Sequence, residues 1–135
     1  MANLLYPKFK QGLLNKEHDV DTDIIKATLV DTGAYTYAAT HYAYGTDIPA
    51  GAKIAVSPQL TTPTIVDGVF DTADFTWTAV TGAQSEAIVL WNDTTTTPTA
   101  DALIALYDTG MTGMPVTPNG GNINVTVHAS GWFAL

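Results

Sequence analysis

The sequence of 135 residues contains no cysteine and no arginine. The lack of cysteine excludes disulfides, thiolate metal sites and cysteine nucleophiles. Charged residues are also scarce: five lysines against 13 acids make up 13% of the chain and leave a net charge of -8. Nucleic acids and anionic membranes are bound through clustered Lys and Arg, so this composition argues against either as a partner.

The few charges are unevenly distributed along the chain. Residues 1–53 hold all five lysines and six acids, for a net charge of -1, whereas residues 54–135 hold seven acids and no base, for -7. Much of the remaining polar surface must come from the 22 threonines. Two interpretations stay open: an ordinary threonine-rich β surface, or a surface partly buried against other subunits, because charged side chains are depleted at the cores of interfaces.

Neither a targeting signal nor a membrane span is visible. The start of the chain lacks a basic region followed by an apolar run, and no apolar stretch approaches the ~20 residues that cross a bilayer. We therefore expect a protein that is made in the cytoplasm and is soluble there. The length predicts one domain, with residues 1–15 as an N-terminal arm and residues 16–135 as a single β-sandwich domain.

The arm is expected to contain a short helix. Tyr6, Phe9 and Leu13 recur at helical spacing, and Pro7 suits the first turn of a helix. Asn15 is expected to end the helix in a left-handed conformation. So short a helix is unstable alone and must dock on its own domain or on a neighbouring subunit.

The rest of the chain predicts eight or nine short strands. Asp67-Gly68 is the strongest hairpin signal, and Phe75, Trp77 and Ala79 are expected to share one face of a strand. The apolar runs at residues 86–91 and 102–108 are typical of central strands that are buried on both faces, with the threonine-rich residues 94–99 as an exposed loop between them. Further strands are expected at residues 24–30, 52–56, 64–66, 69–71 and 122–128. This pattern predicts an all-β, antiparallel, jelly-roll-like β-sandwich.

Catalytic and metal-binding signatures are missing from the sequence. Residues 19–23 begin like a calcium loop, but Ile24 and Val30 stand where such a loop needs Gly and Glu, so we expect a solvated acidic turn. The three histidines lack zinc spacing, and the three serines lack the nucleophile-elbow pattern. Glu86 is the one acid expected to be half-buried, at a strand end, bonded to backbone or a threonine. The sequence predicts no enzyme, no metal and no cofactor.

Four tyrosines gather between residues 35 and 44. Extended backbone would place Tyr35 and Tyr37 on one face, and likewise Tyr42 and Tyr44. Aromatic rings with a polar tip suit both interfaces and carbohydrate surfaces. A ring-packed loop over one end of the domain, a subunit contact and a glycan-binding surface therefore remain as alternatives.

Several stretches, spread over nearly the whole chain, resemble the small virion and head-decoration proteins of tailed bacteriophages. They are MANLLYPKFKQGLL, IIKATLVDTGAYTYAATHYAYGTDIPAGAKIA, VDGVFDTADFTWTAVTG and LIALYDTGMTGMPVTPNGGNINVTV. The matching phrases mark turns and strand edges, so no functional residue is carried over. The chain departs from the group in its end, HASGWFAL, and in its lack of arginine.

The resemblance implies a non-enzymatic cement protein that binds the major capsid protein on the outer surface of the head and stabilises the capsid lattice. We expect a symmetric dimer or trimer, assembled in the host cytoplasm. Its acidic C-terminal portion would face either a basic capsid patch or solvent. A tail or baseplate module that contacts a host glycan is the alternative function. The candidate subunit or capsid contacts, for which packing inside the domain is the alternative, are Leu4, Leu5, Tyr6, Phe9, Tyr35, Tyr37, Tyr42, Tyr44, Trp132 and Phe133.

Overall fold

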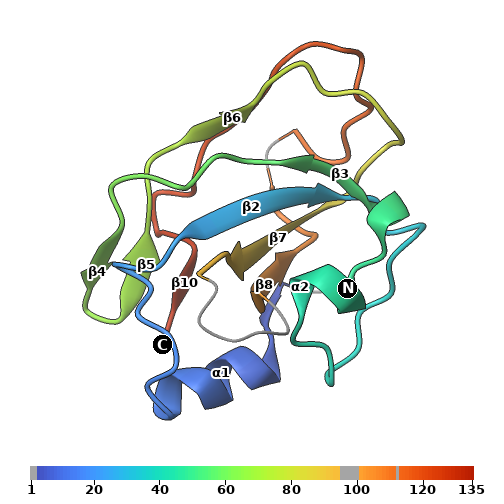
Figure 1. The fold of residues 1–135 in the computed structure, drawn as a ribbon. Coiled ribbons are helices and arrows are strands. Elements are labelled where there is room, and N and C mark those ends of the chain that lie inside the picture. The colour runs from blue at the N-terminus through green and yellow to red at the C-terminus, as the bar shows by residue number, and fades with distance from the viewer. Residues whose placement is uncertain (1–2, 95–100, 112) are drawn as a thin grey trace.

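Short antiparallel strands form most of the regular structure (Figure 1). The structure, a computed structural model, describes residues 3–94, 101–111 and 113–135; most of the expected loop at 94–99 therefore lies outside the described residues. The strands are β1 (Leu4–Leu5), β2 (Ile25–Val30), β3 (Lys53–Val56), β4 (Thr64–Val66), β5 (Val69–Asp71), β6 (Phe75–Trp77), β7 (Ala87–Asn92), β8 (Ala102–Tyr107), β9 (Ile123–Val125) and β10 (Phe133–Ala134). The helices are α1 (Pro7–Leu14), α2 (Tyr44–Asp47) and a 3₁₀ turn, η1 (Ala50–Ala52).

The main sheet has five antiparallel strands in the order β1-β8-β7-β2-β3. All of β7 and nearly all of β8 are buried, as their uninterrupted apolar sequences predicted. In β2, alternation places Ala27 and Leu29 on one face and Lys26, Thr28 and Val30 on the other. Both faces of the sheet must therefore be covered by other parts of the chain.

Two smaller antiparallel sheets, β10-β5-β4 and β6-β9, accompany the main sheet. From β6, the Nε1–H of Trp77 donates a hydrogen bond to the backbone oxygen of Ala27, at 3.2 Å. Beside β10, Trp132 packs on Tyr107 of β8, with ring centroids 5.4 Å apart. These contacts join the smaller sheets to the main one through a core of aromatic side chains.

The structure confirms a mostly β chain with antiparallel sheets and a short N-terminal helix. The helix has Pro7 in its first turn, as expected, but Asn15 is right-handed at φ -84°, and Lys16 takes the left-handed conformation at φ 62°. The expected left-handed Asn15 is therefore wrong. The strand β1 was not foreseen, because its two residues were assigned to the arm.

The strand expected to contain Phe75, Trp77 and Ala79 ends early, at Trp77. Ala79 has φ 52° and is exposed instead of sharing the face of Phe75 and Trp77. Hydrogen bonds from Ala79 N to Asn122 Oδ1 and from Val80 N to the Gly121 oxygen hold this bend. The expectation for Ala79 was wrong because these partners lie some 40 positions away in the sequence.

The hairpin signal at Asp67-Gly68 is confirmed. Asp67 has φ 51° and Gly68 has φ 80°, the two positive values that a type I′ turn requires. The turn joins β4 to β5 with Val66 opposite Val69. Figure 1 shows this hairpin at the left end of the main sheet, with α2 at the right.

Candidate binding surface

Tyr35 and Tyr37 both turn toward Tyr6, which precedes α1. The Tyr6 and Tyr35 hydroxyls share a buried hydrogen bond of 2.8 Å, and the Tyr35 hydroxyl lies 3.0 Å from His41 Nδ1. The Tyr37 ring lies 5.5 Å from that of Tyr6. Burial raises the pKa of both the Tyr6 and the Tyr35 phenol above the ordinary tyrosine value, so both stay neutral. This cluster ties the arm to the segment that follows β2.

The expectation that Tyr42 and Tyr44 share a face is wrong. Tyr44 starts α2, is 7% exposed and stacks on Trp91 with centroids 3.9 Å apart and planes 3° apart, whereas Tyr42 is 49% exposed. The extended backbone that would align the two rings ends where the helix begins. Of the four tyrosines Tyr42 alone is exposed, and the glycan-binding alternative stays a prediction with one ring available to it.

The buried stack of Tyr44 on Trp91 is held by polar and cationic contacts. Thr28 Oγ1 accepts a 2.9 Å hydrogen bond from Trp91 Nε1 and shares another, also 2.9 Å, with the Tyr44 hydroxyl. The Lys53 ammonium lies 4.2 Å from the Tyr44 ring centroid, and the Lys26 ammonium lies 5.6 Å from the Trp91 ring. Burial lowers the pKa of Lys53 below its ordinary value. The sequence showed no sign of this stack and its contacts, because they join residues from four separate elements, β2, α2, β3 and β7.

The proposed anchors at the two ends of the chain pack largely within the domain. Tyr6 and Phe9 are 0% and 1% exposed, and Trp132 is 6% exposed. Phe133 is partly buried between Phe9 and Phe70, with ring centroids 5.9 and 5.4 Å away. Leu4 and Leu5 on β1 are also partly buried. These positions match the alternative of packing inside the domain, and a capsid contact through them stays a prediction.

Polar candidates from the sequence have structural partners. Glu86 Oε2 accepts hydrogen bonds from the backbone N and the hydroxyl of Thr32, at 3.0 and 2.9 Å, as expected for a strand-end carboxylate. In the acidic turn, Asp23 Oδ2 accepts hydrogen bonds from Asp19 N and Asn92 Nδ2. Within the described ranges, no three or more His, Asp or Glu side chains are placed to hold a metal ion, and no helix there is long and apolar enough to cross a bilayer.

An exposed apolar surface lies at the β4–β5 hairpin, where the sequence predicted a turn and its two strands but no binding surface. Ile65 is 50% exposed and Val66 is 64% exposed, although both belong to β4. Leu135 is 71% exposed, and its backbone N donates a hydrogen bond to the Gly68 oxygen at 3.0 Å. We call these three residues and the groove beside them the hairpin surface. The short sequence TIV gave no signal that both faces of the strand would be exposed.

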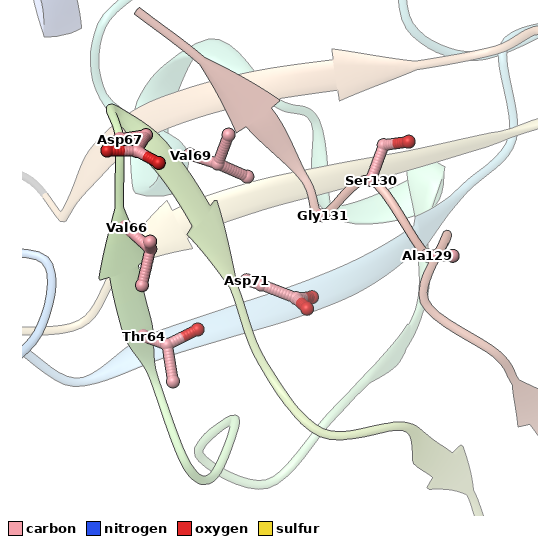
Figure 2. Close-up of a pocket in the computed structure, with 8 residues that line it drawn as sticks. All are labelled: Thr64, Val66, Asp67, Val69, Asp71, Ala129, Ser130 and Gly131. Atoms are coloured by element: carbon pink, nitrogen blue, oxygen red, sulfur yellow. The ribbon is translucent and has the colours of Figure 1, made fainter.

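Figure 2 shows the residues that line the groove of the hairpin surface. The groove has a volume of about 360 Å³. Val66 and Val69 contribute apolar side chains, and Asp67 and Asp71 contribute carboxylates. Gly131 forms part of the wall; its φ is 79°, and an added Cβ would lie 2.7 Å from the Phe70 oxygen. Glycine is therefore required for the wall to approach β5 so closely. The full lining comprises Thr64, Val66, Asp67, Val69, Asp71, Ala129, Ser130 and Gly131.

Comparison with known proteins adds no relative: no protein-family model and no curated protein matches the chain. The resemblance to phage virion proteins therefore stays a prediction.

Proposed function

We propose that the chain is a non-enzymatic structural protein of a tailed-bacteriophage virion, which binds the major capsid protein on the outer head surface and stabilises the capsid lattice. In this proposal the antiparallel sheets form a jelly-roll-like sandwich, and copies associate as dimers or trimers on the head. The chain would act by adhesion, without a cofactor.

The hairpin surface is the observation that supports adhesion most directly. It combines the exposed side chains of Ile65 and Val66 on β4, and of Leu135 directly after β10, with a groove bordered by two carboxylates. Exposed apolar groups grouped on a strand edge are typical of surfaces that bind another protein. The network of buried aromatic side chains behind the hairpin supplies a stiff support.

The proposal is tested by locating the chain on intact virions of the phage that encodes it. Antibody-gold labelling in electron microscopy should mark the heads, and removal of the chain should make the heads more sensitive to heat or chelator. Labelling confined to tails, or absence of the chain from purified particles, would reject a head-decoration role.

A rebinding experiment adds a matched control. Stripped heads should take up the purified wild-type chain and a variant with a changed remote exposed residue, Val56→Ser, to the same level. The variant Val66→Ser, which alters an equally small apolar side chain on the hairpin surface, should rebind more weakly. Circular dichroism of both variants checks that the fold is retained.

A further inference from the structure

The outer edge of β4 is open to strand addition. The strand pairs with β5 on one side, and no strand pairs with its other side in the described residues. The Phe70 oxygen accepts a hydrogen bond from Trp132 N at 2.8 Å, on the side of β5 away from β4. Phe70 and its partner Ile65 therefore form a non-hydrogen-bonded pair, so the N–H and C=O of Ile65 point away from β5, toward the open side.

The available edge is short. Pro63 lacks an N–H and stands two positions before Ile65, so it limits the backbone hydrogen bonds that an added strand can form. Prolines on edge strands also reduce uncontrolled pairing between copies. Specific binding at this edge must therefore draw on side-chain contacts as well as on the backbone of Ile65.

The groove beside the edge provides such contacts. Alternation places Thr64 and Val66 on the same side of the small sheet as their partners Asp71 and Val69, and all four line the groove. A volume of about 360 Å³ suits a few side chains of an extended segment. Val66 and Val69 would contact an apolar side chain, while Asp67 and Asp71 would favour a cation.

Charge decides between a second copy and a different protein. The chain has a net charge of -8, and residues 54–135 hold no lysine or arginine. Two copies paired through β4 would bring four groove carboxylates together without a compensating cation from the same region. A partner that places a Lys or Arg on the groove face would instead neutralise Asp67 and Asp71.

We propose that the β4 edge and its groove bind an extended segment of another protein that carries an apolar and a basic side chain two positions apart, so that both lie on the groove face, with the apolar side chain on Val66 and Val69 and the cation beside Asp67 and Asp71. The segment adds to β4 as a further strand through hydrogen bonds with the backbone N–H and C=O of Ile65. Applied to the head, this inference rests on the proposed function and assigns the segment to the major capsid protein.

The test is an NMR titration with a short synthetic peptide in which lysine and valine stand two positions apart, with threonine between them, and a second peptide in which glutamate replaces lysine. The basic peptide should shift the amide signals of Ile65, Val66 and Val69, and should bind more weakly as salt is added. The acidic peptide should leave these signals unchanged. Shifts centred elsewhere, equal binding of both peptides, or no shift at all would overturn the proposal.

Paired variants separate the groove from net charge. The variant Asp67→Asn/Asp71→Asn preserves the turn, since Asn-Gly also favours type I′, and should weaken peptide binding about three- to tenfold. The control Asp31→Asn/Asp47→Asn removes the same charge near the end of β2 and in α2, and should bind as wild type does. Equal weakening by both variants would mean that net charge alone matters, and would overturn the site.

Two further outcomes are decisive. Concentration-dependent shifts at Ile65 without peptide would show that a second copy occupies the edge, and would overturn the choice of a different protein. Because the titration uses no virions, its failure is distinguishable from failure of the head-decoration proposal. If heads carry the chain but the double variant at Asp67 and Asp71 rebinds them normally, the head contact lies on another surface and this inference fails.

Discussion

Replacing Thr28 by valine isolates the hydrogen bonds that hold the buried stack of Tyr44 on Trp91. Valine has nearly the shape of threonine, but it removes the Oγ1 that lies 2.9 Å from Trp91 Nε1 and 2.9 Å from the Tyr44 hydroxyl. Thr28 is 0% exposed and the two rings are 5% and 7% exposed, so water does not replace the lost partner. An unsatisfied buried group costs about 1–3 kcal/mol, so we expect Thr28→Val to reduce the free energy of unfolding by about 3 kcal/mol.

Thr28→Ser is the matched control, because it retains the hydroxyl and removes one buried methyl group, at a cost of about 1 kcal/mol. Urea unfolding followed by tryptophan fluorescence measures both values, and thermal midpoints should fall by roughly 12 °C for valine and 4 °C for serine. Hydrophobicity and β propensity both favour valine over serine. A valine variant as stable as the serine variant, or more stable, would therefore refute the hydrogen-bond argument.

Four further outcomes are expected. Deletion of residues 1–14 should abolish the cooperative thermal transition, because Tyr6 and Phe9 are buried; a folded product would show instead that the arm is separable. Gly131→Ala should lower the thermal midpoint, since its Cβ would meet backbone at 2.7 Å; an unchanged midpoint would contradict the close packing. Lys53→Met should reduce the free energy of unfolding by about 1 kcal/mol through loss of the cation–π contact, whereas no loss in urea titration would mean that the ammonium contributes nothing. Burial lowers the pKa of His18 below 6.5, so protonation of this side chain should leave the free energy of unfolding unchanged above pH 6.5 and reduce it as the pH falls through the lower folded pKa. Calorimetry across this range should show a smaller decline in the free energy of unfolding for His18→Gln than for wild type. An equal decline would exclude His18 as the cause.

Local sequence signals predicted the elements that depend on nearby residues. Pro7 and the spacing of Phe9 and Leu13 placed the helix, and Asp67-Gly68 placed the hairpin, because their backbone preferences act within a few residues. The apolar runs that became β7 and β8 were predicted as buried strands, since such short, uninterrupted apolar sequences are typical of strands covered on both faces.

Such local signals did not predict which side chains are exposed on the surface. Tyr42 and Tyr44 have the same local pattern, yet one is exposed and the other is stacked on Trp91. Likewise, Pro63 is compatible with an edge strand, but the sequence around Ile65 does not show that both Ile65 and Val66 are exposed. Exposure at these positions depends on which distant segment packs against them.

The sequence by itself determined the charge of the chain, its β-rich character, the N-terminal helix and the tight turn between β4 and β5, because composition and short-range backbone preferences are local properties. Only the tertiary structure decided which aromatic side chains are buried, that Thr28 joins Tyr44 to Trp91, and that Asp67 and Asp71 share one groove with Val66 and Val69. Those relations arise from contacts between segments far apart in the chain, and are set by how the sheets pack.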